Sequence, residues 1–275
     1  MKPLLKWAGG KRHIAKTLEK HLPGDWSTGT YFEPFLGGAA LFLHLSPPKA
    51  VLADLNPWLV RFYQDVRDEP VKLVAGIRSI ADAFDGSPLD SKKDFYLGLR
   101  TNFNASNVSL GSSALLFALN KLCFNGLYRE NSKGKFNVPF GQKTRFPSLY
   151  EEEFFTASEM LSEISINLSD FEETVSEAER GDFVYFDPPY VPVSETSNFT
   201  SYSSEGFGRE AQIRLASTMV ELKKKGVRAM TSNSFTNLTS EIYGELRQEV
   251  ILAPRMVSAS AAGRGEVKEL LILNY

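Results

Sequence analysis

Cysteine and histidine are scarce in this 275-residue sequence, which holds one cysteine, Cys123, and three histidines. A single cysteine excludes an internal disulfide framework and a cysteine-based zinc site, and three histidines do not favour a metal centre. No uninterrupted apolar run reaches the roughly 20 residues that a membrane helix needs. The first residues also lack the apolar core of a signal peptide. We therefore expect a cytoplasmic protein without a bound metal or a membrane partner.

An excess of charge of one sign is also missing, because 31 basic residues face 33 acidic ones and the net charge is −2. The local distribution is uneven. Residues 1–16 carry five basic side chains and no acid, residues 121–145 carry six against Glu130 alone, and residues 150–179 carry ten acids and no base. Two basic segments favour one positive face for an anionic polymer. Uneven surface charge without a partner is the alternative.

Strand and helix patterns alternate at both ends of the chain. A short apolar run at 30–36 leads through two glycines into a helix at 39–45, and a strand at 50–53 leads into a helix capped by Asn56. This order predicts an α/β fold with a parallel sheet, since parallel neighbours need a crossover. The later elements are predicted as strands at 165–168, 183–186 and 227–231, a helix at 210–225, and an antiparallel pair at 250–257 and 267–273.

Helical periodicity dominates the middle of the chain, at 71–84, 95–103 and 112–124. A polar stretch rich in glycine and asparagine follows and predicts a β-hairpin over 125–141. We therefore expect a discontinuous sheet domain of residues 1–58 and 148–275, and a mostly helical insertion of residues 59–147 with a hairpin loop. With 43% hydrophobic residues, the chain has the usual composition of a globular protein.

The turn after the first strand reads Glu33-Pro34-Phe35-Leu36-Gly37-Gly38. Glycines there let the backbone approach a ligand closely, and the next helix offers free N–H groups. Asp54 closes the second strand 17 residues after Gly37, where a carboxylate can accept hydrogen bonds from both ribose hydroxyls of an adenosine moiety. These residues predict a cofactor site formed by Glu33, Phe35, Gly37 and Asp54. Alternatively, Asp54 only caps a helix.

Asp187-Pro188-Pro189-Tyr190 directly follows an apolar strand. Two prolines prevent continued strand pairing and fix φ, so the turn is rigid. A carboxylate, a proline carbonyl and an aromatic ring at the carboxyl end of a strand form an acceptor pair beside a stacking surface. That set suits an exocyclic amine on a flat heterocycle. A simple strand-terminating turn with Tyr190 packed at its rim is the alternative.

Two further segments carry basic and aromatic side chains. In Lys6-Trp7-Ala8-Gly9-Gly10-Lys11, either Trp7 packs over a purine while Lys11 pairs with a carboxylate, or Trp7 fills a gap in the packing. The hairpin segment carries basic residues that neutralise phosphates, and arginine reads guanine bidentately. A solvated loop has the same composition. The basic residues of this loop are Arg129, Lys133, Lys135, Lys143 and Arg145.

The chain resembles DNA adenine-N6 methyltransferases of the Dam type, nearly from end to end. The resemblance lies in LKWAGGK, FEPFLGG, ADLNPWL, FNGLYREN…GKFNVPFG, FDPPY, NFTSY and TSN, in that order. It implies a Rossmann-like methyltransferase sheet with a DNA-recognition insertion, S-adenosylmethionine as methyl donor, S-adenosylhomocysteine as product and double-stranded DNA as substrate. It also implies that Trp7, Lys11, Asp54 and Asp187 contact the cofactor. Such enzymes serve restriction–modification systems as well as DNA replication and repair, and we expect a monomer.

In the family's recognition insert, positions matching Lys6, Leu127, Arg129 and Pro139 contact bases of GATC. Phe124 and Asn125 match positions that press into the base stack. With Lys143 of the basic loop, these residues form the predicted DNA-binding set. The sequence departs from the family's pattern at Ala39, where a second spaced glycine is common, at Gln142, where an arginine is common, and at Phe124, where tyrosine is frequent.

The sequence predicts direct methyl transfer to N6 of an adenine that has been flipped out of the duplex. Asp187 would accept one N6 hydrogen and the Pro188 carbonyl the other, while Tyr190 covers the base. Methylation of cytosine N4 or of an RNA base is a near alternative, because the same acceptor pair serves any exocyclic amine. Two other classes are a nicotinamide-dependent oxidoreductase, for which a clear G-x-G-x-x-G is missing, and a DNA-binding regulator without catalysis.

Titration calorimetry separates the cofactor classes. We expect heat of binding with S-adenosylmethionine and none with NAD, because a clear G-x-G-x-x-G is missing and Asp187-Pro188-Pro189-Tyr190 would have no role in an oxidoreductase. Binding of NAD alone would support the oxidoreductase and contradict the methyltransferase.

Overall fold

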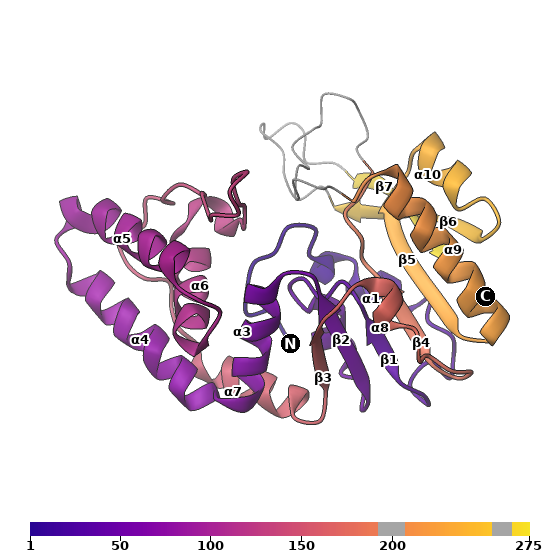
Figure 1. Cartoon of the computed structure of the whole chain (residues 1–275), viewed down its shortest axis with the longest axis horizontal. Helices are drawn as coiled ribbons and strands as arrows, with labels where there is room; N and C mark the ends of the chain where they lie inside the picture. The colour runs from indigo at the N-terminus through magenta and orange to yellow at the C-terminus, as the bar shows by residue number, and fades with distance from the viewer. Residues whose placement is uncertain (192–206, 255–265) are drawn as a thin grey trace. The chain divides into compact units, whose positions relative to one another are not determined.

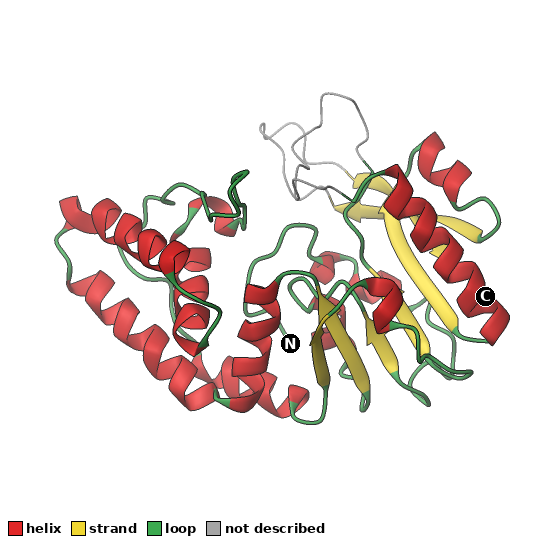
Figure 2. Cartoon of the chain, viewed as in Figure 1, coloured by secondary structure: helices red, strands yellow, loops and turns green. Residues whose placement is uncertain are grey.

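The computed structural model covers the whole chain and describes all residues except 192–206 and 255–265, so that the NFTSY segment at 198–202 lies outside the described residues. The described residues form an α/β fold with a seven-stranded sheet (Figure 1, Figure 2). Its order is β3-β2-β1-β4-β5-β7-β6. The strands are β1 Tyr31–Glu33, β2 Ala50–Asp54, β3 Ser165–Leu168, β4 Phe183–Phe186, β5 Arg228–Ser234, β6 Arg247–Pro254 and β7 Glu266–Leu273.

The chain divides into two compact units. One comprises Met1–Gly10, Gly37–Ser46 and Asp54–Leu168, and the other comprises Lys11–Leu36, Pro47–Ala53 and Ser169–Tyr275. We call them the helical unit and the sheet unit. The functional division at residues 59 and 147 stays a prediction.

In the sheet unit, β1 pairs in parallel with β2 and with β4, and β4 pairs in parallel with β5. The predicted antiparallel pair at the C-terminus is confirmed as far as the described residues reach, since β7 pairs antiparallel with β5 and β6. Strand β4 is fully buried, as expected for a central strand with cover on both faces. The unit also contains η1 Lys11–His13, α1 Ala15–Glu19, α8 Phe171–Thr174, α9 Arg209–Lys225 and α10 Asn237–Ile242.

A hydrophobic core joins one face of this sheet to its helices. Phe32, Val184 and Phe186 of the strands pack with Leu215 and Met219 of α9. Burying side chains of this size contributes about 1.5–3 kcal/mol each. Gly226, with φ +78°, ends α9 in the left-handed conformation that favours glycine. Figure 2 shows α9 running along β5.

The helical unit is built around α6, which packs against α3, α4 and α5. Asn56 caps α3 as predicted, accepting hydrogen bonds from the N–H groups of Trp58 and Leu59, and Pro57 occupies the first helical position. Ser109 and Ser112 form a capping box at the start of α6. The helices are α2 Ala40–Leu45, α3 Pro57–Asp68, α4 Pro70–Gly86, η2 Leu89–Ser91, α5 Lys92–Ala105, α6 Leu110–Leu122, η3 Phe124–Gly126 and α7 Glu151–Leu161.

Some predicted boundaries are wrong. The first strand spans only Tyr31–Glu33, because Pro34 has no N–H to donate to a neighbouring strand. The helix predicted to reach Phe124 ends at Leu122, and Asn125 adopts a left-handed φ of 56°. The predicted hairpin closes through two isolated antiparallel bridges, Cys123–Phe140 and Glu130–Phe136, rather than through continuous strands.

Candidate functional site

The order of the sheet places its topological switch point between β1 and β4. Strand β1 pairs with β2 on one side and with β4 on the other. Ligands of open parallel sheets bind outside the carboxyl ends of the strands at such a point. Strand β1 ends at Glu33, and Asp187 directly follows β4. Both carboxyl ends at the switch point therefore carry an acid.

Asp187 forms an ion pair with Lys11 that is mostly excluded from solvent. Lys11 Nζ lies 2.6 Å from Asp187 Oδ1, and the two side chains are 7% and 19% exposed. Burial raises the pKa of Asp187, whereas the Lys11 ammonium lowers it and so opposes the cost of burying a carboxylate. Lys11 Nζ also lies 4.4 Å from the centroid of the Tyr190 ring, within cation–π range.

Tyr190 is held at its other end by Glu269 of β7. Its hydroxyl donates a hydrogen bond of 2.7 Å to Glu269 Oε2. Burial and the neighbouring carboxylates Asp187 and Glu269 raise the pKa of Tyr190, so that it remains a donor at neutral pH. The ring is thus fixed at its face by Lys11 and at its hydroxyl by Glu269. Sequence reasoning missed Glu269, because nothing in the local pattern of β7 connects it to a residue 79 positions earlier.

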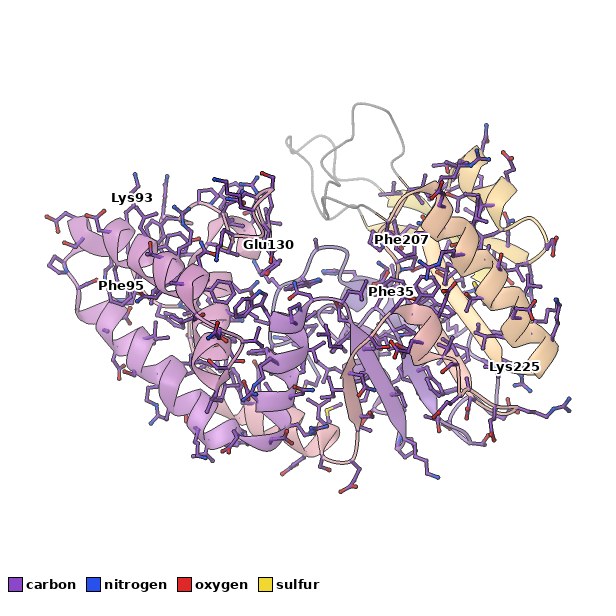
Figure 3. The ribbon with its side chains drawn as sticks, viewed as in Figure 1. Phe35, Lys93, Phe95, Glu130, Phe207 and Lys225 are labelled. Carbon is purple, nitrogen blue, oxygen red and sulfur yellow. The ribbon has the colours of Figure 1, made fainter. Side chains whose placement is uncertain are left out.

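Glu33 and Phe35 lie at the end of β1 and just after it. Glu33 is buried, and its Oε2 accepts a 2.7 Å hydrogen bond from the Tyr31 hydroxyl. Phe35 is half-buried and packs against Phe171, Phe186 and Phe207, with 5.4 Å between the ring centroids of Phe35 and Phe207 (Figure 3). Phe35 therefore has a packing role in the sheet unit in addition to its predicted role beside a cofactor.

The glycine turn and Asp54 meet within the helical unit. The N–H of Gly37 donates to Asp54 Oδ2 at 3.0 Å, and the N–H of Asn56 donates to Asp54 Oδ1 at 2.9 Å. Burial raises the pKa of Asp54, while these backbone donors lower it. A Cβ added to Gly38 would lie 3.4 Å from Trp7 Cβ. The predicted cofactor residues Trp7, Gly37 and Asp54 thus belong to one closely packed region.

The N-terminal segment is also tied to the loop that follows α6. The buried Asn120 side chain accepts from the Lys6 N–H and donates to the carbonyls of Lys6 and Gly126. The Trp7 and Tyr128 rings stack with centroids 4.9 Å apart. Trp7 therefore has a packing partner of its own. Tyr128 was not predicted as a site residue, although it lies between Leu127 and Arg129.

The predicted DNA-binding side chains are exposed to solvent. Phe124 is 52% and Leu127 37% exposed. Arg129 is exposed and its Nε donates to Asn137 Oδ1 at 2.7 Å, while the Phe124 N–H donates to the Pro139 carbonyl at 2.9 Å. The exposed members of the predicted set are Lys6, Phe124, Asn125, Leu127, Arg129, Pro139 and Lys143.

Two of the departures from the family's pattern have a left-handed backbone. Ala39 has φ 54° and Gln142 has φ 54°, a region that costs a non-glycine residue about 1–2 kcal/mol. A glycine at position 39 would adopt it without strain.

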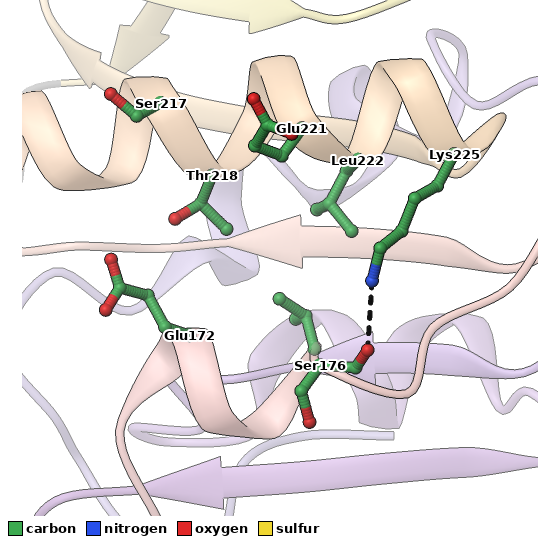
Figure 4. Close-up of a pocket in the computed structure, with 8 residues that line it drawn as sticks. Glu172, Ser176, Ser217, Thr218, Glu221, Leu222 and Lys225 are labelled. Carbon is green, nitrogen blue, oxygen red and sulfur yellow. Dashed lines mark hydrogen bonds between the residues drawn. The ribbon is translucent and has the colours of Figure 1, made fainter.

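A pocket elsewhere in the sheet unit contains none of the predicted residues. It lies between α8 and α9, where Lys225 Nζ donates to the Ser176 carbonyl at 3.0 Å (Figure 4). Within the described ranges, no cluster of three or more histidine, cysteine, aspartate or glutamate side chains could hold a metal ion. No described helix is long and apolar enough to cross a membrane. The residues that line the pocket between α8 and α9 are Glu172, Val175, Ser176, Ser217, Thr218, Glu221, Leu222 and Lys225.

The doubly wound sheet, the acid after β4 and the exposed loop after α6 agree with the proteins to which the chain is similar. The model of the D12 class N6 adenine-specific DNA methyltransferases matches residues 7–257. The chain belongs to this family, which confirms the resemblance and identifies it as an adenine-specific DNA methyltransferase.

Individual relatives match along nearly their whole length. A type II methyltransferase of Lactococcus lactis subsp. cremoris is 39% identical, over 100% of this chain and 96% of its own. A DNA adenine methylase of Vibrio cholerae is 37% identical, over 98% and 94%. A type II methyltransferase of Methanocaldococcus jannaschii is 36% identical, over 100% and 99%.

Replacing Lys11 tests the ion pair through stability. Without the ammonium, the pKa of Asp187 rises further above its unfolded value. The free energy of unfolding of Lys11→Met should therefore fall as pH rises, because Asp187 must then ionise without a partner. We expect a loss of about 3 kcal/mol at pH 8, the low end for a broken buried pair, and a smaller loss at pH 5. Urea unfolding at both pH values measures it.

The matched control is Lys72→Met, because Lys72 pairs with Glu69 on the surface and should change stability little at either pH. Adding Asp187→Asn to Lys11→Met should restore most of the loss at pH 8. A loss of equal size at both pH values would show that the pair does not set the charge of Asp187.

Proposed function

We propose that this methyltransferase transfers the methyl group of S-adenosylmethionine to N6 of adenine in double-stranded DNA, within GATC, after flipping the base out of the helix. The observation that carries the proposal is the rigid turn after β4. There the Asp187 carboxylate, the Pro188 carbonyl and the Tyr190 ring follow one another at the switch point of the sheet.

The residues of the helical unit fit an adenosine-containing cofactor. Asp54 is fixed by two backbone N–H groups at the end of a strand, an arrangement suited to ribose hydroxyls. Gly37 and Gly38 keep side-chain volume away from the turn, and Trp7 adjoins Gly38. The resemblance adds Lys11, Glu33, Phe35 and Asp187 of the sheet unit to the proposed contacts. When bound, S-adenosylmethionine supplies an electrophilic methyl group, and S-adenosylhomocysteine is the product.

In the proposed mechanism, the chain's groups orient the amine and hold its protons. The N6 lone pair is delocalised into the purine ring. Asp187 accepts a hydrogen bond from one N6–H and the Pro188 carbonyl accepts one from the other, which favours tetrahedral geometry at nitrogen. As N6 forms its bond to carbon, it must lose one proton, and Asp187 is placed to receive it. Tyr190 covers the base, and positioning with fixed electrostatics supplies most of the acceleration.

Lys11 gives Asp187 the charge that this step requires. A carboxylate is an acceptor only, whereas the protonated acid presents a donor. Because burial raises the pKa of Asp187 and Lys11 opposes that shift, the ion pair favours the ionised carboxylate before the substrate arrives.

The exposed loop after α6 supports the proposed contacts with DNA. We propose that Lys6, Leu127, Arg129 and Pro139 contact the bases of GATC and that Lys143 neutralises phosphate. Phe124 and Asn125 would fill the space that the flipped adenine leaves. Opening the duplex costs a few kcal/mol, and burying an exposed ring such as Phe124 offsets part of that cost. The protein would act as a monomer in the cytoplasm, where it meets chromosomal DNA.

Asp187→Ala should abolish methyl transfer and leave DNA binding nearly unchanged, because the substitution removes the acceptor without touching the basic loop. Filter-bound tritium from labelled S-adenosylmethionine measures transfer, and fluorescence anisotropy of a labelled duplex measures binding. Asp82→Ala, on the exposed face of α4, is the control. Transfer at the normal rate by Asp187→Ala would remove the proposed mechanism.

The target can be tested by plasmid digestion. Plasmid from a methylation-deficient host expressing this chain should resist an endonuclease that is blocked by N6-methyladenine in GATC. It should be cut by one that requires that mark. Single-base methylation sequencing then separates adenine N6 from cytosine N4. Complete cleavage by the blocked endonuclease, with methylation at another sequence, would contradict the GATC target but not the proposed methyl transfer.

A further inference from the structure

The two backbone groups on either side of Tyr190 bind buried side-chain amides. Gln212 Nε2, from α9, donates to the Pro189 carbonyl at 2.9 Å. The Val191 N–H donates to Asn233 Oδ1, from β5, at 3.0 Å. Both amide side chains are fully buried. Buried polar groups are costly unless they are satisfied, so hydrogen-bonded amides resist displacement.

The two amides are also bonded to each other. Asn233 Nδ2 donates to Gln212 Oε1 at 3.0 Å, and the Tyr243 hydroxyl donates to the same oxygen at 2.8 Å. A carbonyl only accepts and a backbone N–H only donates, so the contacts with Pro189 and Val191 fix which end of each amide is nitrogen. The network therefore has a single direction of donation.

The two proline carbonyls of the turn therefore differ in their hydrogen bonding. The Pro189 carbonyl is occupied by Gln212, whereas the described residues provide no hydrogen-bond donor to the Pro188 carbonyl. Rotating the peptide after Pro189 would break the bond to Gln212 and leave the buried Gln212 Nε2 without this acceptor. The side-chain amides thus determine which carbonyl of the turn is left for a ligand.

We propose that Gln212 and Asn233 are positioning residues for methyl transfer. By holding the backbone on both sides of Tyr190, they fix the directions of the Asp187 carboxylate and the Pro188 carbonyl toward the amine. The inference deepens the proposed function and rests on it. It also gives a role to Asn233 of the TSN segment, whose similarity to the family carried no function of its own.

Gln212→Glu tests the direction of the hydrogen-bond network. It replaces the NH2 donor group of the Gln212 side chain by an oxygen with little change of shape. An ionised Glu at this position points an acceptor at the Pro189 carbonyl and repels it, whereas the protonated acid donates as the amide does. Burial raises the pKa of such an acid, so the change of state falls in an accessible range. Of the described residues hydrogen-bonded to the Gln212 side chain, Tyr243 alone titrates, and burial raises its pKa so that it stays protonated.

The measurement is the single-turnover rate of methyl transfer to a GATC duplex, per folded enzyme, as a ratio to wild type across pH. We expect Gln212→Glu to be about 10²-fold slower at high pH, the usual effect of misplacing reacting groups by about 1 Å. The ratio should recover by roughly tenfold or more on acidification as the acid regains its donor. Affinity for DNA should stay near wild type.

Two variants make the comparison decisive. Gln248→Glu makes the same exchange at a glutamine whose Nε2 donates to the Ser240 and Tyr243 carbonyls near α10, and its ratio should stay near one at every pH. Gln212→Met lacks the donor at every pH, so its slow rate should not recover in acid. It also tests the proposal if the charged variant fails to fold.

A folded Gln212→Glu or Gln212→Met with the wild-type rate would overturn the proposal. So would a rate loss in Gln248→Glu equal to that in Gln212→Glu, since both would then report general destabilisation. The wild-type enzyme in the same assay separates this inference from the proposed function. If wild type does not methylate adenine, the proposed function fails. If wild type methylates and the Gln212 variants match it, only the positioning role fails.

Discussion

The ion pair between Lys11 and Asp187 is the interaction on which the candidate site depends. A carboxylate at the carboxyl end of a central strand loses most of its hydration, and burial alone would favour the neutral acid. Lys11, at a distance of 2.6 Å, opposes this effect of burial and at the same time lies over the Tyr190 ring. One ammonium therefore contacts both the Asp187 carboxylate and the Tyr190 ring.

Around that pair, the turn after β4 is fixed from several directions. Prolines restrict φ within it, Glu269 holds the Tyr190 hydroxyl, and the buried amides of Gln212 and Asn233 hold the backbone on either side. Each contact comes from a different element of the sheet unit. A turn that is supported in this way enters a reaction already in its working geometry, so little ordering remains to oppose binding.

Part of the fold and of the candidate site could be predicted from sequence, because neighbouring residues specify the local structure there. Asn56-Pro57 specifies a helix start without reference to the rest of the fold, and Asp187-Pro188-Pro189-Tyr190 carries its rigidity in its own residues. The contact of Gln212 with Pro189 joins residues 23 positions apart, and that of Tyr190 with Glu269 joins residues 79 apart. Neither contact leaves a periodic pattern in the sequence, because the partners become neighbours only in the folded chain. The hairpin was expected from its glycines and asparagines, but its lack of continuous strands depends on packing that sequence does not reveal.

Ala39 has a wider consequence for the glycine turn. Its methyl group is fully buried, and its backbone occupies a conformation that alanine rarely adopts. Compared with glycine, alanine has fewer alternative conformations to visit, both in the unfolded chain and in local openings. At the start of α2, the chain thus combines a strained backbone conformation with a smaller loss of conformational entropy on folding than glycine would have.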